Sequence, residues 1–480
     1  MSECIILNIE ALGDCMSRFV RIIGMEIFNF KNVTHGEIRF PNYQPVEYKG
    51  IIQKKDISGI YGQNGSGKTA VVEAFDILKS VLSGKPIPFA GYNGIIYDNT
   101  CLQVSFFVEE NGKQYKVIYK TNLNVCHGLI AVLKESLTFY IRGASWKSES
   151  HIEFDNPFYL DDVLSEDVHA SVVKTGKGFE ECAFLDNPDK LAVSCASKGL
   201  SFFFNSSLLN SLNETNNPSD FRGVVSTISD YSKRSLFVIK VGQLAQINSR
   251  ELLPLNVSDC VSGYAIYGCI PLFLNGTGLI AKDVYEKLPF IIESVNIALE
   301  AIIPDLNLEF DVMGEELSKE GVTFVKINMY SIRGGHRFST KYESEGIKRI
   351  ISLLSCLVSV YNSEGFSLVV DELDSGIFEY LLGELLYAFE KEAKGQLIFT
   401  SHNLRAFEKL SNESIICSTV NPNDRYIRLI GLNQNNNKRD YYIRALALGG
   451  QKESLYDGDE LDNIGYAFRK AGKRTGTDNG

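Results

Sequence analysis

The stretch that decides the fold is Gly62-Gln63-Asn64-Gly65-Ser66-Gly67-Lys68-Thr69, which matches the pattern G-x-x-x-x-G-K-[ST]. A short apolar run, Ile57 to Tyr61, precedes it, and an amphipathic segment, Ala70 to Leu82, follows it. This order of strand, loop and helix is the context in which the pattern binds phosphate. Backbone N–H groups of such a loop turn toward phosphate oxygens, and the helix start adds the positive end of its dipole. The alternative is a glycine-rich turn that fits the pattern by chance.

The loop predicts specific nucleotide contacts. Lys68 is expected to reach the β- and γ-phosphates, and the Thr69 hydroxyl is expected to ligate Mg²⁺. The loop residues predicted to bind nucleotide are Gly62, Asn64, Gly65, Ser66, Gly67, Lys68 and Thr69. The sequence therefore predicts a protein that binds ATP or GTP.

A second element of the same site follows much later in the chain. Ser367 to Val370 is an apolar run that ends in two carboxylates, Asp371 and Glu372. A buried strand that delivers Asp-Glu at its end fits a Walker B element, in which Asp371 holds Mg²⁺ and Glu372 acts as general base toward water. The alternative is an acidic strand end at an ordinary turn.

Another apolar run, Gln396 to Thr400, ends in Ser401-His402. At this interval after a Walker B element, His402 is predicted to contact the γ-phosphate. Standing alone, such a histidine is more often a helix cap or a satisfied polar residue.

Residues 343–347, ESEGI, precede a strongly apolar helical segment that leads into the Walker B run. Ser344 and Gly346 at a helix N-terminus predict an anion site. The alternative is plain capping, since serine is a good N-cap. The position of the segment, one helix before Walker B, favours a signature motif.

The amino-acid composition narrows the classes of protein to which the chain can belong. The 480 residues are 44% hydrophobic and 22% charged, with a net charge of −11, which argues against a uniformly basic nucleic-acid binder but leaves a local basic groove open. No apolar run approaches the ~18–20 residues of a membrane span, and no signal peptide is recognised. The ten cysteines form no C-x-x-C pair, which favours buried free thiols in a reducing cytoplasm over a zinc site. Translation is expected to start at one of three methionines: Met1, Met16 or Met25.

The remaining sequence indicates alternating strands and helices. Leu102 to Glu109 and Gln114 to Thr121 flank Asn111-Gly112, a strong hairpin signal. Further strands are predicted at 25–30, 36–40, 137–142, 321–330 and 337–341, and helices at 283–303, 347–361 and 378–391. Residues 145–280 show no heptad pattern and predict an inserted mixed or helical subdomain without a long coiled coil. Asn435-Asn436-Asn437 opens a polar tail that is expected to end in disorder.

Taken in chain order, these motifs resemble the ABC-type ATPases of the SMC/RecF class. The resemblance rests on Phe30-Lys31-Asn32, the phosphate loop, Ser344-Glu345-Gly346, Asp371-Glu372-Leu373-Asp374 and Ser401-His402. More narrowly, it is similar to compact bacterial anti-phage and abortive-infection ATPases of the AriA-like or PtuA-like kind. It covers roughly residues 25–120 and 280–415. The signature departs from the family pattern, because it is Glu-Ser-Glu-Gly rather than Leu-Ser-Gly-Gly.

The resemblance implies an α/β P-loop head, a mixed sheet with flanking helices, that dimerises around ATP and Mg²⁺. It divides the chain into an N-terminal lobe (20–144), an inserted subdomain (145–280), a C-terminal lobe (281–432) and an extension (433–480). Lys68 and Thr69 of one copy would meet Ser344 and Gly346 of another. Lys31 and Asn32 would lie near the base or ribose, Asp374-Ser375-Gly376 would form the D-loop, and Gln103 is a candidate Q-loop residue. ATP is expected rather than GTP.

The sequence leaves three competing candidate functions. The first is a cytoplasmic ATPase sensor or scaffold in bacterial anti-phage defence that controls a separate nuclease or toxin effector; the last ~70 residues are too short for a complete nuclease domain of their own. The second is a RecF-like DNA repair or replication ATPase, for which Lys438-Arg439, Arg444, Arg469-Lys470 and Lys473-Arg474 are candidate DNA contacts. The third, an ABC transporter subunit, fits poorly with the signature and the large insertion.

Overall fold

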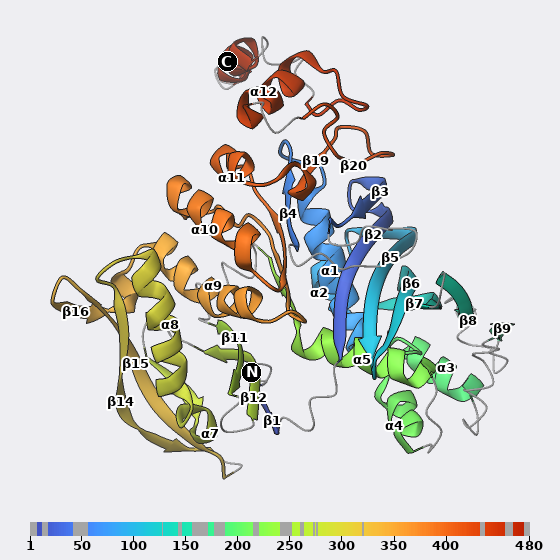
Figure 1. Cartoon of the computed structure of the whole chain (residues 1–480), viewed down its shortest axis with the longest axis horizontal. Coiled ribbons are helices and arrows are strands. Elements are labelled where there is room, and N and C mark those ends of the chain that lie inside the picture. Colours follow the sequence, from blue (N-terminus) through green and yellow to red (C-terminus); the bar gives the residue numbers. More distant parts are fainter. Residues whose placement is uncertain are drawn as a thin grey trace, which may run out of the picture.

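The computed structural model describes residues 7–11, 18–41, 56–126, 128–142, 146–155, 171–176, 188–214, 220–240, 252–259, 264–271, 274, 277–318, 321–432, 437–456 and 464–474. The chain has a mixed α/β fold in which helices lie between and around several sheets (Figure 1). This confirms the mixed α/β class expected from the sequence.

The central sheet is built from short apolar runs. Its strand order is β10-β17-β18-β4-β19-β20, with bounds Leu236–Ile239, Ser367–Val370, Gln396–Thr400, Asp56–Tyr61, Ile415–Ser418 and Tyr426–Ile427. The pairs from β10 to β19 are parallel, and β20 joins antiparallel. Every residue of β4, β17 and β18 is buried, as expected for strands covered on both faces. Because these strands run the same way, their carboxyl ends meet at one edge of the sheet.

A long antiparallel sheet lies beside it. The order is β3-β2-β5-β6-β7-β8-β9, with bounds Val33–Arg39, Phe19–Phe30, Ile96–Glu110, Lys113–Cys126, Leu129–Arg142, Trp146–Asp155 and Ser171–Gly176. The predicted hairpin is confirmed: Glu110 pairs with Lys113 around Asn111-Gly112, and both turn residues have positive φ, at 50° and 76°. Strand β2 begins at Phe19, earlier than the predicted start at Met25.

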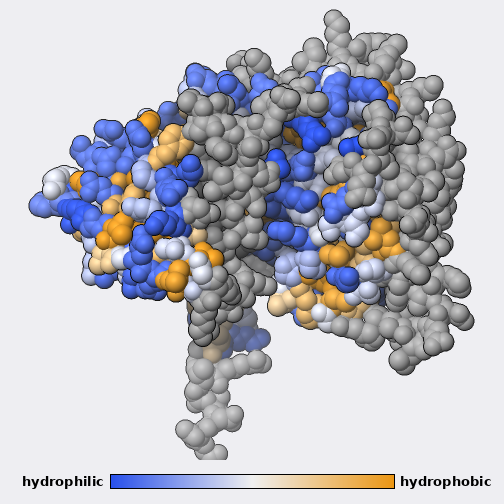
Figure 2. Space-filling view, turned by 90° about the horizontal axis from the view of Figure 1, so that it is seen from below, coloured by the Kyte–Doolittle hydropathy of each residue, from blue (hydrophilic) through white to orange (hydrophobic). Residues whose placement is uncertain are grey.

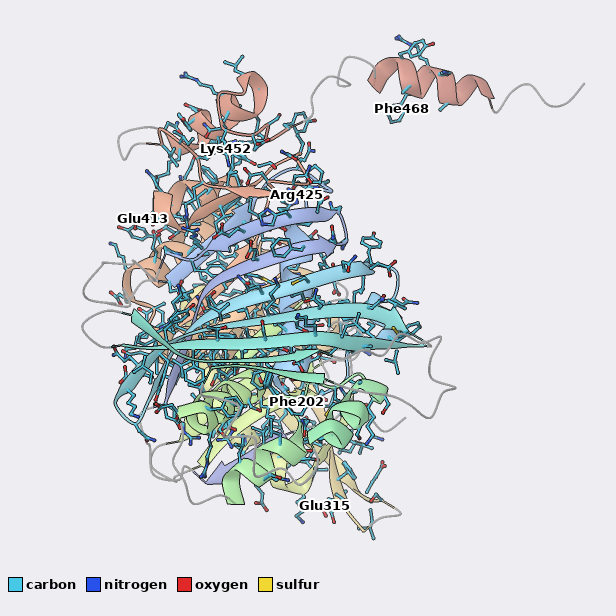
Figure 3. All side chains as sticks on the ribbon, turned by 90° about the vertical axis from the view of Figure 1, so that its right-hand side faces the viewer. Phe202, Glu315, Glu413, Arg425, Lys452 and Phe468 are labelled. Carbon is cyan, nitrogen blue, oxygen red and sulfur yellow. The ribbon has the colours of Figure 1, made fainter. Side chains whose placement is uncertain are left out.

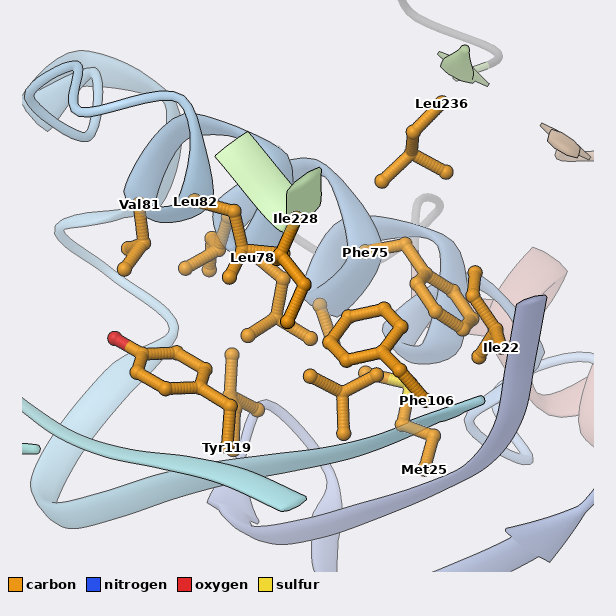
Figure 4. Packing of buried hydrophobic residues seen from close by; sticks show 14 of the residues in the cluster. Ile22, Met25, Phe75, Leu78, Val81, Leu82, Phe106, Tyr119, Ile228 and Leu236 are labelled. Carbon is orange, nitrogen blue, oxygen red and sulfur yellow. The ribbon is translucent and has the colours of Figure 1, made fainter. Parts of the chain in front are cut away.

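Helix α1 (Lys68–Leu82) lies between these two sheets and fills the main core. Figure 4 shows its Phe75, Leu78 and Leu82 facing Met25 and Phe106 of the antiparallel sheet. Ile398 and Val369 of the central sheet belong to the same buried cluster. The helix that follows the phosphate loop is therefore fixed from both sides, and so is the loop at its N-terminus.

Other helices cover the opposite face of the central sheet. They are α9 (Glu345–Asn362), α10 (Glu379–Glu392), α11 (Leu404–Lys409) and α12 (Lys438–Leu448). Helix α9 also packs on a further sheet made of β13 (Thr277–Ala281), β14 (Asn307–Leu317), β15 (Thr323–Arg333) and β16 (His336–Ser339), together with α7 (Lys282–Tyr285) and α8 (Leu288–Ile302). Helix α9 thus connects this further sheet to the central one.

Two predicted elements differ from the structure here. The single helix expected over 283–303 is split into α7 and α8, because Pro289 lies in the first turn of α8 and cannot donate to a preceding turn. Strand β14 was not predicted, since half of its residues are charged or small and its outer part is exposed. The predicted β15–β16 hairpin is confirmed.

Described segments of the interval 145–280 join several parts of the fold. Strands β8 and β9 extend the antiparallel sheet, and β10 pairs with β17 in the central sheet. Helices α3 (Pro188–Ser197), α4 (Ser206–Glu214) and α5 (Asp220–Arg234) belong to this interval, as do β11 (Leu252–Asp259) and β12 (Tyr264–Pro271), which form a small sheet with β1 (Leu7–Ala11). The division of the chain at 144 and 280 stays a prediction.

The polar tail contains two helices. Tyr442 of α12 is buried and stacks near Phe407 of α11, so this part of the expected extension is packed on the body. Helix α13 (Ile464–Arg474) carries Phe468 and stands clear of the body in Figure 3. The disorder expected beyond it falls outside the described residues. No described helix is both long and apolar enough to cross a membrane.

Candidate active site

A cavity of about 230 Å³ lies at the carboxyl edge of the central sheet. Its lining residues are Lys31, Asn32, Asn64, Gly65, Gly67, Lys68, Thr69, Ala70, Asp371, Glu372 and His402. Segments from four regions of the sequence therefore meet in one place: residues 31–32, residues 64–70, residues 371–372 and His402. The parallel register explains the meeting, because β4, β17 and β18 are neighbours and all three deliver their following residues to this edge.

The phosphate loop connects β4 directly to α1. Gly67 is the N-cap of α1, with φ of 90°, a conformation that residues with a Cβ adopt only with strain. No side chain caps this helix start. The first N–H groups of α1 are consequently left for a ligand, which is the arrangement that binds anions at helix N-termini.

Residues far along the chain hold the loop in shape, and sequence reasoning did not identify them. The Tyr426 hydroxyl donates to the carbonyl of Gly67 at 2.7 Å. Ser418 Oγ is hydrogen-bonded to Ser66 Oγ and donates to the carbonyl of Tyr61 at 3.1 Å. All of these atoms are buried, so the loop conformation is fixed before any ligand arrives.

Lys68 lies with its ammonium inside the loop. Its Nζ donates to the carbonyls of Gly62 at 2.9 Å and Gln63 at 2.7 Å, and the side chain is 6% exposed. Burial lowers the pKa of Lys68 to about 8, against the opposing attraction of Asp371 and Glu372. The lysine is thus a cation at pH 7 that lacks full solvation, and an anion in the cavity would supply the missing partner.

This pKa predicts how nucleotide affinity changes with pH. A bound phosphate favours the ammonium form, so binding above pH 8 requires proton uptake by Lys68. We expect the affinity for ATP to weaken as pH rises through about 8, by at most about tenfold per pH unit. Titration calorimetry between pH 7 and 9.5 checks this on the Glu372→Gln variant. An affinity that stays constant across this range contradicts the role of Lys68 as the phosphate cation.

The two carboxylates are held differently. Asp371 is 1% exposed, and its Oδ1 accepts hydrogen bonds from Thr400 Oγ1 at 2.6 Å and Thr69 Oγ1 at 3.4 Å. A hydroxyl from the loop and a carboxylate from the strand therefore face each other. Such oxygen ligands suit Mg²⁺, which keeps most of its waters and takes few protein ligands. The donor set fits the predicted metal site at Thr69 and Asp371.

Glu372 has a left-handed backbone, with φ of 47°. A non-glycine residue there costs about 1–3 kcal/mol and persists only where its surroundings enforce it. The Glu372 N–H donates to Thr400 Oγ1 at 2.7 Å, and its carbonyl accepts from Arg349. These two contacts turn the chain sharply after β17 and place Glu372 in the cavity wall.

Arg349 of α9 is a site residue that sequence reasoning missed. The side chain is 6% exposed, and Nη2 donates to the carbonyl of Asp371 at 3.2 Å as well as to that of Glu372. Burial lowers the pKa of Arg349, while Asp374, Glu372 and Asp371 oppose this shift. Arg349 links the helix that begins at the signature segment to the two carboxylates.

We expect Arg349→Ala to lower the free energy of unfolding by about 2–4 kcal/mol, because one buried and one partly buried carbonyl lose a charged donor. Chemical denaturation measures this. Arg405→Ala is the matched control, since Arg405 forms a partly exposed pair with Glu408 at 3.1 Å and lies over the Tyr380 ring, and its loss should cost about 0–1 kcal/mol. Equal losses in the two variants contradict the assignment.

His402 follows β18 and lines the cavity. Its backbone N–H donates to Asp374 Oδ2 at 3.1 Å, which fixes the turn after the strand. Desolvation lowers the pKa of His402, and nearby Lys68 lowers it further, although Asp374, Glu372 and Asp371 oppose the shift. The ring is therefore mainly neutral at pH 7, able both to donate and to accept a hydrogen bond.

Lys31 and Asn32 form the rim of the cavity on the side of β2 and β3. Lys31 has φ of 54°, and its Nζ pairs with Glu73 Oε2 of α1 at 2.8 Å. Asn32 Nδ2 donates to the carbonyl of Gly65, and the Asn32 carbonyl accepts from Arg425. Both residues line the cavity beside the loop. Their contact with base or ribose stays a prediction.

The signature residues lie elsewhere. Ser344 is exposed and is the N-cap of α9, accepting from the N–H of Ile347 at 3.3 Å. A Cβ on Gly346 would lie 2.0 Å from the carbonyl oxygen of Gly376, so only glycine allows this contact. Neither Ser344 nor Gly346 lines the cavity of its own chain. Gln103 also lies outside the cavity lining, where its Nε2 donates to Glu26 at 2.9 Å.

Comparison with known proteins gives matches among solved structures alone, since no protein-family model and no curated protein matches. An Smc head bound to the C-terminal winged-helix domain of ScpA is 11% identical, with a TM-score of 0.43 over 85% of this chain and 97% of that one. An SMC head from Thermotoga maritima is 14% identical, with a TM-score of 0.34 over 85% and 99%. An Smc head from Pyrococcus furiosus, with an extended coiled coil and bound to the C-terminal domain of ScpA, is 10% identical, with a TM-score of 0.38 over 89% and 99%. At these values the similarity carries no conclusion about activity or partners.

Proposed function

We propose that the chain is a Mg²⁺-dependent ATPase of the ABC type, which hydrolyses ATP to ADP and phosphate. The observation that carries this proposal is the single cavity that joins the phosphate loop, Asp371, Glu372 and His402. Each residue type there has a distinct task in phosphoryl transfer: a cation, a metal-binding pair, a carboxylate base and a neutral imidazole.

Each residue of the cavity has a separate role in the proposed reaction. ATP and Mg²⁺, when bound, supply the phosphoanhydride and neutralise its charge. Lys68 and the free N–H groups of α1 hold phosphate oxygens, while Thr69 and Asp371 hold the metal. Glu372 accepts a proton from water, and His402 donates a hydrogen bond toward the terminal phosphate.

A second copy of the chain completes the site. Ser344 is exposed at the N-terminus of α9, and Gly346 beside it is partly exposed. Neither lines the cavity of its own chain, so both are available to another copy. The Gly346–Gly376 contact joins the signature segment to the proposed D-loop, so both approach a partner together. ATP bound between the two copies then holds them together, and its hydrolysis allows them to separate.

The biological role that we propose is a cytoplasmic, nucleotide-driven sensor or scaffold of bacterial anti-phage defence that controls a separate nuclease or toxin. This part rests on the resemblance of the motif order to compact anti-phage ATPases. A RecF-like DNA repair ATPase is the second candidate, and the cations of α13 favour it. Both roles use the same ATP site.

Affinity purification of tagged Glu372→Gln protein from its native cells, with ATP and Mg²⁺, separates the two roles. Protein and nucleic acid that copurify are both identified. A stoichiometric nuclease or toxin encoded by a neighbouring gene supports the defence role. Recovery of DNA without such a protein contradicts it and supports repair. Lys68→Ala protein is the control, because neither complex should form without nucleotide.

A further inference from the structure

An open groove between α8 and β14 has no role in the proposed ATP site. Its volume is about 430 Å³, and its lining residues are Pro289, Ile292, Glu293, Asn296, Ile297, Glu300, Asn307, Leu308, Glu309 and Phe310. The floor is apolar, and Ile297 on its edge is 71% exposed. Figure 2 shows hydrophobic residues bordered by hydrophilic ones on the left-hand part of the molecule, where α8 and β14 lie.

Three of the ten residues that line the groove are glutamates, and none of the ten is Lys or Arg. The four carboxylates of β14 are all paired: Glu309 and Asp311 with Arg337 at 3.2 and 2.7 Å, Glu315 with Lys282 at 3.3 Å, and Glu316 with Lys326 at 3.9 Å. Within the described part of the chain, no cation forms an ion pair with Glu293 or Glu300. These two exposed carboxylates flank the apolar floor and would attract a cationic ligand.

Helix α13 has the opposite character. Its sequence, IGYAFRKAGKR, contains four Lys or Arg and no Asp or Glu. At helical spacing Ala467, Phe468 and Ala471 share one face. Lys470 borders this face, whereas Tyr466 and Arg469 lie on the opposite side. Phe468 is 77% exposed. An apolar face bordered by cations is therefore presented to solvent, although burial of that face is what would stabilise so short a helix.

We propose that α13 of one copy docks in the α8/β14 groove of a second copy. Phe468 and the two alanines would cover the floor beside Ile297, and Lys470 at the border of that face would approach Glu293 or Glu300. The lengths agree, because 11 residues of helix span roughly 16 Å and Pro289 to Glu300 of α8 spans a similar length. In Figure 3 Phe468 of α13 lies at the top of the view and Glu315 of β14 at the bottom, so a second copy supplies the helix.

This contact is head to tail, and it is independent of nucleotide. A heterologous interface of this kind produces rings or open chains of copies. It differs from the proposed ATP-dependent contact through Ser344 and Gly346, neither of which lines this groove. The proposed contact therefore predicts self-association that occurs without nucleotide and is weakened by salt.

Analytical ultracentrifugation of the full chain without nucleotide, at low and at high salt, tests the proposal. Phe468→Asp and the pair Glu293→Lys with Glu300→Lys should each weaken self-association by about tenfold or more. Tyr466→Asp is the matched control on the other face of α13 and should change it by less than about threefold. Mixing Lys470→Glu protein with Glu293→Lys/Glu300→Lys protein should restore association.

Three results would overturn the proposal. The first is a monomer at every salt concentration. The second is a Phe468→Asp variant that associates as the wild type does. The third concerns a labelled peptide of residues 457–480: binding to anionic vesicles or to DNA, with none to the protein, would assign α13 to those partners. None of these results bears on ATP binding, so the proposed function is tested separately.

Discussion

Glu372→Gln should abolish ATP turnover while preserving ATP binding. The amide keeps the size of the carboxyl group but cannot accept a proton from water, and loss of a general base costs on the order of 10²- to 10⁴-fold in rate. The backbone at Glu372 should persist, because Thr400 and Arg349 hold its N–H and carbonyl, and neither contact uses the side chain. Phosphate release under excess ATP measures turnover, and calorimetry measures binding.

Glu379→Gln is the matched control, since Glu379 is exposed in the first turn of α10 and does not line the cavity. Its turnover should equal that of the wild type. A Glu372→Gln variant that hydrolyses ATP at the wild-type rate removes Glu372 from the mechanism. Loss of both binding and turnover would instead show that the carboxylate is needed to hold the ligand.

Lys68→Ala should remove nucleotide binding without unfolding the chain. Truncation of a buried cation that pairs with an anion costs about 2–5 kcal/mol, which is roughly 30- to 5000-fold in affinity. The protein itself should tolerate the change, because burial already disfavours the charged form of Lys68 and the site that holds its ammonium is a cavity wall rather than the packed core. Calorimetry with ATP and Mg²⁺ measures the affinity.

Lys85→Ala serves as the comparison, since Lys85 is exposed just beyond the C-terminus of α1. It should bind ATP as the wild type does, and thermal unfolding should be similar for both variants. Wild-type affinity in Lys68→Ala protein would mean that the loop does not hold phosphate.

The parts of the site that the sequence predicted are those with a local pattern. The phosphate loop, the strand that ends in Asp371-Glu372, and the strand that ends before His402 each combine an apolar run with a fixed set of following residues. Parallel strands then bring these ends to one edge, and the cavity lining includes Asp371, Glu372, His402 and most of the predicted loop residues, but not Gly62 or Ser66. Lys31 and Asn32 also line the cavity, and their nucleotide contacts stay a prediction.

The parts that the sequence did not predict depend on contacts between distant residues. Arg349 resembles any basic residue on an amphipathic helix, and its role is visible only once α9 lies against β17. Tyr426 and Gly67 are 359 positions apart. Strand β14 lacks an apolar run because its outer half is solvated, and the break between α7 and α8 follows from one proline. Such features follow from packing, which local periodicity does not encode.

The central claim is that two copies build one ATP site, and complementation between two inactive variants tests it most directly. Glu372→Gln lacks the base, and Ser344→Arg obstructs the signature segment; each alone should be inactive. When equal amounts are mixed before ATP is added, half of the dimers combine both variants, and one of their two sites is intact. We predict that ATP turnover of the mixture recovers to roughly a quarter of the wild-type rate. A mixture no more active than its two components would contradict a site shared between copies.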